Sequence, residues 1–274
     1  MASPFAAQIL PNRAVIRLTG EAPLGFLHNL LTCDLLHLPE CLWAYGALLS
    51  PQGKIQHDVF VIHDGVTVYV DCAASQRDGL LQKLKLYRLR ARIEIAPDDG
   101  HAVAVATSDG LAATDPRLPG TGLRAIVQAG SLAAGTGYDT ARMALGLADS
   151  DADIGENLLF PHEANLDQLH GVSFSKGCYV GQEVVSRMQH RSTARSRILP
   201  VNGDGHLPSK GTEIHAGDVR IGELLSSAGD LGLALLRLDR LAEAASPLLA
   251  DSVRLSVQKP DWMNIPLTMP DGAT

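Results

Sequence analysis

The sequence has few cysteines, and none of them forms a Cys-x-x-C pair. The four are Cys33, Cys41, Cys72 and Cys178. Zinc knuckles and protein-bound iron–sulfur clusters use closely spaced thiols, because one metal centre needs several thiolates at once. The chain contains neither motif, so we expect no metal site in it. In a reducing compartment these cysteines are expected to be free thiols.

Long apolar runs are also absent. No stretch of eighteen apolar residues occurs among the 274, although 46% of them are apolar, and a membrane-spanning helix needs about 20. The first fifteen residues, MASPFAAQILPNRAV, lack the basic and then apolar segments of an export signal. We therefore expect a globular cytoplasmic protein with no membrane partner.

Positive charge is scarce overall, and the formal net charge is −7. Affinity for nucleic acid comes chiefly from Lys and Arg, so this balance argues against nucleic acid as a partner. The segment 176–197 differs, because it holds five Lys or Arg residues and one acid, a local charge of +4. This suits an anionic ligand, although a solvated helix surface would also explain it.

Apolar residues alternate at 13–18 and 90–95, a pattern typical of half-buried strands. Turn signals separate three further predicted strands, at 45–49, 54–62 and 66–71, and strands also fit 101–107 and 123–128. Helical spacing marks segments around 24–31, 80–87 and 138–147. Strands joined both by helices and by hairpins indicate an α+β fold.

After Arg197 the pattern changes to short strands separated by glycine turns, including 219–225 and 232–238. This is typical of a small β-barrel. We therefore divide the chain into a first α+β lobe region over 1–110, interleaved with the second lobe, then the second lobe over 111–197, and a barrel over 198–274.

One segment differs from the rest of the chain. Gly177 and Gly181 bracket Cys178 and Tyr179, which suggests a tight loop, and a helix is predicted to begin near Gln182. A thiol just before a helix and two residues from Lys176 is in a setting that lowers its pKa and favours the reactive thiolate. The alternative is a small buried apolar residue, as many free cysteines are.

The run from Lys176 to Glu183, KGCYVGQE, resembles the K-G-C-Y-x-G-Q-E signature of the folate-binding YgfZ-type family, which includes mitochondrial iron–sulfur assembly factors. The resemblance extends to FPHEANLD at 160–167, LHNLLTCDL at 27–35 and LSPQGKIQHD at 49–58. It therefore covers most of residues 13–200.

The family is similar in fold to the glycine-cleavage T-protein. The resemblance implies two α+β lobes around a central folate-binding opening, plus a C-terminal barrel. It also implies tetrahydrofolate as cofactor, and a role in assembly or repair of iron–sulfur clusters, particularly [4Fe–4S], with client enzymes or assembly proteins as partners. Cys178 is then the functional thiol, as a nucleophile, a transient cluster ligand or a thiol that exchanges with a partner.

The resemblance also implies folate-binding residues. A carboxylate fits the two-donor edge of a pterin, and the best matches are Asp58 and Glu163, although these could be a surface acid and a helix cap. Arg142 resembles a T-protein arginine, although a buried structural arginine would look the same. The remaining candidates are Lys176, Tyr179, Gln182 and Arg187.

Two other functions stay open. One is a folate-dependent aminomethyltransferase of the glycine-cleavage type, whose family is longer and lacks the K-G-C-Y-x-G-Q-E loop. The other is a folate-responsive interaction module without catalysis, since fold does not fix function. Whether the chain transfers a one-carbon unit or a thiol is not decided by the sequence. The absence of a heptad seam favours a monomer.

Overall fold

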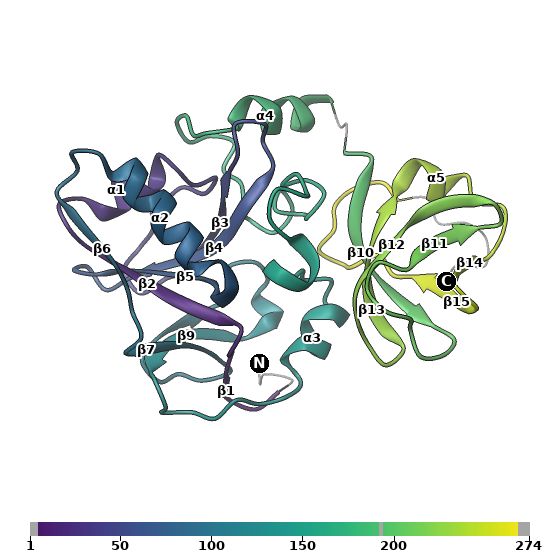
Figure 1. The fold of residues 1–274 in the computed structure, drawn as a ribbon, viewed down its shortest axis with the longest axis horizontal. Coiled ribbons are helices and arrows are strands. Elements are labelled where there is room, and N and C mark those ends of the chain that lie inside the picture. Colours follow the sequence, from purple (N-terminus) through teal and green to yellow (C-terminus); the bar gives the residue numbers. More distant parts are fainter. Residues whose placement is uncertain (1–4, 192–193, 268–274) are drawn as a thin grey trace.

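The computed structural model describes residues 5–191 and 194–267 and contains three sheets (Figure 1). The first sheet has five antiparallel strands in the order β3-β4-β5-β2-β6. Its strands are β2 (Arg13–Gly20), β3 (Ala44–Leu49), β4 (Ile55–His63), β5 (Val68–Ala73) and β6 (Ile93–Pro97). The helices α1 (Pro23–His28) and α2 (Arg77–Arg88), the latter preceded by the short turn η1 (Ala74–Gln76), pack on one face through Leu27, Leu80 and Leu84.

The second sheet packs on the opposite face of the first. It consists of β1 (Gln8–Ile9), β7 (His101–Val105), β9 (Leu123–Gln128) and β8 (Leu111–Thr114), in that order, with η2 (Pro119–Thr121) between β8 and β9. Phe60 and Ile62 of the first sheet share one core with Val103 and Ile126 of the second. The two lobes are interleaved in the chain, since β1 precedes the first sheet and β7 follows it.

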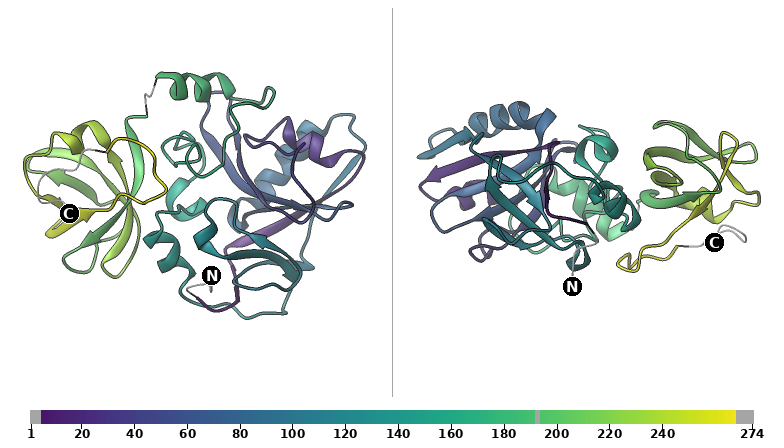
Figure 2. Two further views of the ribbon diagram at one scale, coloured as in Figure 1. Left: turned by 180° about the vertical axis from the view of Figure 1, so that it is seen from behind. Right: turned by 90° about the horizontal axis from the view of Figure 1, so that it is seen from below.

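The chain then runs through α3 (Tyr138–Ala144), η3 (Ser150–Ile154), a series of turns and α4 (Gln182–Arg191) to a closed barrel. The barrel contains β10 (Ser196–Gly203), β11 (Glu213–Ala216), β12 (Val219–Ala228), β13 (Leu231–Arg237), α5 (Leu238–Ala242), β14 (Leu248–Ala250) and β15 (Val253–Val257). It stands at one end of the molecule with a core of its own (Figure 2). The indole of Trp262 ties it to the second lobe by donating to the carbonyl of Leu145 at 2.8 Å.

The predicted α+β class and C-terminal barrel are confirmed. The alternative role of Glu163 as a helix cap is wrong, because no helix begins there and residues 161–170 form consecutive turns. None of the described helices combines the length and apolar character needed to cross a membrane.

Candidate functional site

The loop that carries the signature is fixed on the β3–β4 hairpin, whose tip lies beside α4 (Figure 1). Gly181 has a φ of +82°, and a Cβ there would lie 2.7 Å from the carbonyl oxygen of Ser50. Gly53 in the hairpin turn has a φ of +81°, and a Cβ there would lie 2.8 Å from the Cβ of Val184. Both positions therefore require glycine, and the PQG turn and the signature loop form one unit. Gly177 is different, since a Cβ there would have no neighbouring atom within 4 Å.

Cys178 is exposed on this loop, together with its neighbour Gly177. Cys33 and Cys72 are buried, and burial raises the pKa of each thiol to about 12. Cys41 is also exposed, in the segment between α1 and β3. The thiol singled out by its sequence motif is therefore accessible, and the alternative of a buried apolar Cys178 is excluded.

The side chains of Lys176 and Tyr179 are buried and anchor the loop to the protein. Burial lowers the pKa of the Lys176 ammonium, which donates to the backbone carbonyls of His28, Leu31 (2.5 Å) and Cys33 (3.0 Å). An ammonium has three donors, and all three are used, so the predicted role of Lys176 as a ligand-binding group is corrected to a structural one. Tyr179 is buried beside it, with the Lys176 nitrogen 5.1 Å from its ring centre.

Two predicted residues lie on α4. Gln182 is half-buried at the first position of this helix, and Arg187 is exposed. The Arg187 side chain makes no hydrogen bond or ion pair with another residue in the described part of the chain. Both residues lie close to Cys178 in the sequence.

Glu163 lies in the turns that precede the signature loop. The backbone nitrogen of Phe160 donates to its carboxylate at 2.9 Å, which is the local capping contact that competed with a folate role. The neighbouring Arg197 and Asp167 form a paired fork, at 2.8 and 2.9 Å, that fixes the same turns to β10. Glu163 therefore stabilises a turn, and it is not among the residues that line the cavity at Asp58.

Asp58 and Arg142 both line a small cavity between the two sheets and α3. Asp58 is buried, and the hydroxyl of Tyr45 donates to it at 3.3 Å. Burial raises the pKa of Asp58, while Arg13 and Ser150 oppose this rise. Arg142 donates to Asp139 at 2.8 Å and to Asp153 at 2.7 Å, so its guanidinium is held by internal acids.

Sequence reasoning missed the dominant feature of this cavity, a group of buried arginines. The guanidinium carbons of Arg124, Arg117 and Arg13 lie 3.9, 4.7 and 5.6 Å from the centre of the Phe60 ring. Asp71 pairs with both Arg13 and Arg124, and Asp115 pairs with Arg117. The available signal was charge inside apolar strands, as in VYVDCA at 68–73 and LRAIVQ at 123–128.

Tetrahydrofolate does not fit beside Asp58 in this arrangement. The cavity has a volume of about 10 Å³, which is room for roughly one water molecule, whereas drug-sized ligands occupy roughly 300 Å³ or more. The arginine side chains that line this cavity already stack on the Phe60 ring and pair with acidic side chains. A pterin could enter only if these arginine side chains moved.

The described residues also include no group of three His, Cys, Asp or Glu side chains that could hold a metal ion. Cys178 is not among the residues that line the cavity at Asp58, so the structure contains two distinct features. One is an exposed thiol on a rigid loop, and the other is a closed, charged cavity between the lobes.

Comparison with known proteins supports the assignment of the fold. Residues 195–265 match the family model described as the CAF17 C-terminal beta-barrel domain. The solved aminomethyltransferase T of the Bartonella henselae glycine cleavage system superposes with a TM-score of 0.76, covering 97% of this chain and 88% of that one. Its sequence is 12% identical, so this likeness shows the fold alone.

Two curated relatives cover most of the chain. The human iron–sulfur cluster assembly factor IBA57 is 29% identical over 92% of this chain and 84% of its own length. The IBA57 homologue of Chaetomium globosum is 27% identical over 89% and 74%.

Both relatives are named mitochondrial, which contradicts the predicted cytoplasmic location and points to the mitochondrion. The prediction failed because free cysteines and the lack of long apolar runs argue only against export and membrane insertion. They do not distinguish one reducing compartment from another.

Proposed function

We propose that this chain, a relative of the IBA57-type iron–sulfur cluster assembly factors with the fold of the glycine-cleavage T-protein, itself takes part in iron–sulfur cluster assembly through Cys178. The carrying observation is the exposure of this thiol on a loop fixed by Gly53 and Gly181. A fixed, accessible sulfur can meet a partner protein without a change in the fold. The closer assignment to the YgfZ-type lineage rests on the KGCYVGQE signature and belongs to the same proposal.

The chemistry follows from the number of thiols. Iron–sulfur clusters are held by several ligands, and Cys178 offers one sulfur, which must lose its proton to act as a ligand or nucleophile. The remaining ligands would come from a client enzyme or an assembly protein that docks at this loop. Exchange of the Cys178 thiol with a partner disulfide would use the same exposed position.

Complementation of a strain that lacks the protein tests this role. We expect Cys178→Ala to fail to restore the activity of a [4Fe–4S] enzyme in cell extracts, while Cys41→Ala, which removes the other exposed thiol, restores it. Both variants should melt within about 1 °C of the parent protein, because neither side chain is buried. Full complementation by Cys178→Ala would overturn the proposal.

Tetrahydrofolate binding stays a prediction from the resemblance, and the proposed function does not depend on it. Because the space beside Asp58 admits about one water molecule, we expect an anaerobic calorimetric titration with tetrahydrofolate to give the same result for the parent protein and for Asp58→Ala. Saturable binding that is lost in Asp58→Ala and kept in Cys178→Ala would contradict this expectation. It would place a pterin between the lobes and require the arginines around Phe60 to move.

The parent protein and Cys178→Ala also test the two other functions, an aminomethyltransferase and an interaction module without catalysis. An aminomethyltransferase would transfer a one-carbon unit to tetrahydrofolate in a glycine-cleavage assay. An interaction module would support cluster assembly with Cys178→Ala as well as with the parent chain. No residue geometry favours either over the role of the exposed thiol.

A further inference from the structure

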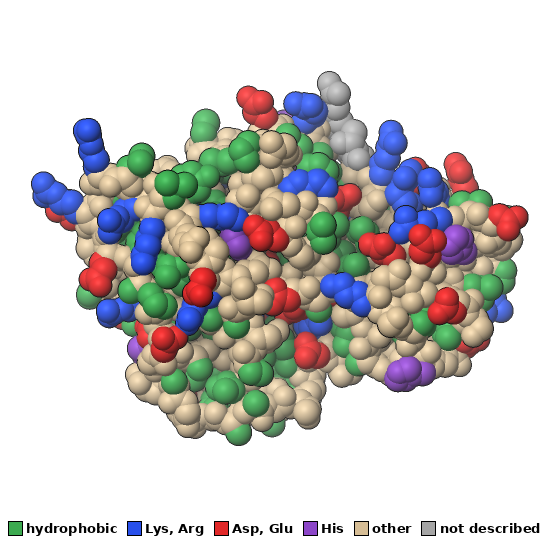
Figure 3. All heavy atoms as spheres, in the orientation of Figure 1, with side chains coloured by type: hydrophobic (Ala, Val, Ile, Leu, Met, Phe, Trp, Pro, Cys, Tyr) green, Lys and Arg blue, Asp and Glu red, His purple; other side chains and the backbone are tan. Residues whose placement is uncertain are grey.

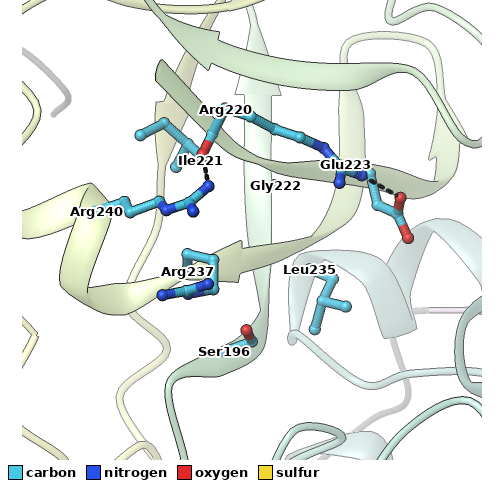
Figure 4. A pocket seen from close by; sticks show the side chains of 8 residues that line it. All are labelled: Ser196, Arg220, Ile221, Gly222, Glu223, Leu235, Arg237 and Arg240. Atoms are coloured by element: carbon cyan, nitrogen blue, oxygen red, sulfur yellow. Dashed lines mark hydrogen bonds and ion pairs between the residues drawn. The ribbon is translucent and has the colours of Figure 1, made fainter.

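A hollow on the outside of the barrel has no part in the role proposed for Cys178. It has a volume of about 410 Å³ and lies between β12, β13, the start of β10 and α5 (Figure 4). Its lining residues are Ser196, Arg220, Ile221, Gly222, Glu223, Leu235, Arg237 and Arg240. Three arginines thus meet in one hollow of a chain whose net charge is −7, and Figure 3 shows basic side chains gathered over this part of the barrel.

Two of the three guanidinium groups are neutralised within the barrel. Arg237 donates to both carboxylate oxygens of Asp239, at 3.0 and 2.6 Å. Arg220 pairs with Glu213 at 3.1 Å and with Glu223 at 2.9 Å. These pairs fix the walls of the hollow, and two arginines against three acids leave a formal charge of −1 on them.

Arg240 is the exception. Its Nη1 donates to the backbone carbonyl of Arg220 at 2.7 Å, which holds the half-buried side chain in place. It forms no ion pair with any residue in the described ranges 5–191 and 194–267. A guanidinium has five donors, so most of them remain for a ligand.

The walls also limit what this ligand can be. Gly222 contributes only backbone, and a Cβ there would lie 2.0 Å from the carbonyl oxygen of Leu235, so position 222 admits no side chain. The half-buried Leu235 and the aliphatic stems of the arginines offer apolar contact. Glu223 contributes a negative charge to the lining, which disfavours a doubly charged phosphate more than a single carboxylate.

We propose that this hollow binds a monocarboxylate with an apolar body, whose carboxylate is held by the fork of Arg240. A planar carboxylate matches the guanidinium geometry, and a charged hydrogen bond of this kind is stronger than a neutral one. Such a group occurs at the chain end of a partner protein and in a free small acid. The two sources share the chemistry that the hollow recognises.

The test follows backbone amide signals of the isotope-labelled protein by nuclear magnetic resonance while N-acetyl-L-leucine is added. We expect saturable shifts confined to β12, β13 and α5. Arg240→Gln should weaken binding about tenfold or more, since it removes a charged hydrogen bond. The affinity of Arg240→Lys should lie between those of the parent protein and Arg240→Gln, because lysine keeps the positive charge but lacks the guanidinium fork. Arg90→Gln, which removes an exposed charge from the first lobe, should bind like the parent protein.

Three results would overturn the proposal. They are the absence of saturable shifts, equal binding by Arg240→Gln, and equal binding by N-acetyl-L-leucinamide, which lacks the carboxylate. Tighter binding of inorganic phosphate at the same residues would also overturn the assigned ligand class. A peptide that ends in leucine with a free carboxylate identifies the source, because tighter binding than the small acid points to a protein chain end. Cys178→Ala should bind normally, so this test is independent of the proposed function.

Discussion

The four cysteines differ in exposure to solvent, since Cys41 and Cys178 are exposed and Cys33 and Cys72 are buried. This difference predicts which thiols react with an alkylating reagent. Under native conditions we expect iodoacetamide to label Cys178 and Cys41 and to leave Cys33 and Cys72 unmodified. Only the thiolate reacts, and burial both shields Cys33 and Cys72 and raises the pKa of each to about 12. Peptide mass spectrometry after a short exposure reads the pattern directly. Labelling of Cys33 or Cys72 at the rate of Cys178 would contradict the structure, and full labelling of all four in urea is the control.

At the same scale, a sequence motif can single out a residue but does not give the direction of its side chain. Cys178 could be found from its motif, and its exposure agrees with a role in function. Lys176, two residues away, could not be assigned correctly, because its partners His28, Leu31 and Cys33 lie more than 140 positions earlier in the chain. Asp58 likewise matched a T-protein position, but the sequence does not show the arginines that close the space around it.

At the scale of elements, the two glycines that bracket Cys178 differ in their contact with the β3–β4 hairpin: Gly181 lies against it and Gly177 does not. We expect Gly181→Ala to lower the free energy of unfolding by about 1–3 kcal/mol, because a Cβ would be strained at this φ and would meet the hairpin backbone. Gly177→Ala adds the same atom on the other side of Cys178, into open space. This substitution should change the free energy of unfolding by less than about 0.5 kcal/mol. Urea unfolding of both variants measures the difference. Equal losses would show that the loop is not fixed by Gly181.

The contact between β4 and α2 predicts a dependence on pH. His57 is buried on β4, and its ring nitrogens lie 3.0 Å from Gln76 and 3.0 Å from the Lys83 ammonium. Burial and then Lys83 lower the pKa of His57, while the hydrogen bond with Gln76 and the charges of Glu156 and Asp58 oppose this. Below the ordinary histidine pKa the unfolded chain therefore binds more protons than the folded one, so stability falls as the pH falls through this range.

Urea unfolding at pH 7.5 and 5.5 measures this effect. We expect the parent protein to lose more stability between the two values than His57→Gln does. The buried His28 and His162, whose pKa values are also lowered, contribute the same loss to both proteins. Asp58, whose pKa is raised, contributes in the opposite direction to both. Equal losses in the two proteins would exclude His57 as a source of the pH dependence.

Elements were predictable where a pattern repeats over several residues. The meander of β3, β4 and β5 and the strand β9 could be predicted, because each is a mostly apolar run of six or more residues, and nearly all of these residues are buried, on both faces of the sheets. The strands β1 and β8 have two and four residues, too few for a period to appear, and they exist because β7 and β9 offer them edges. The sequence suggested a helix cap at Glu163, but residues 161–170 form turns whose apolar residues pack into the core between the sheets.

At the scale of the whole molecule, one carboxylate joins the two lobes. Asp71 on β5 is fully buried and pairs with Arg13 of the same sheet at 2.6 Å. It also pairs with Arg124 on β9 of the other sheet, whose Nε lies 2.7 Å away. Removing one partner from a buried charged network leaves the others uncompensated in a low-dielectric interior. Because the barrel has its own core, this damage should be confined to the two lobes.

We therefore expect Asp71→Asn to lower the free energy of unfolding of the lobes by about 3–5 kcal/mol. Asp78→Asn, which removes the same charge from an exposed position, should change it by less than about 0.5 kcal/mol. Hydrogen exchange measures the lobes and the barrel separately. In Asp71→Asn the amides of β5, β7 and β9 should exchange faster than in the parent protein, and the amides of β12 and β13 should exchange at the parent rate. Faster exchange in the barrel as well would mean that the three sheets unfold as one unit. A loss below about 1 kcal/mol would mean that packing around Phe60, not the charge of Asp71, holds the lobes together.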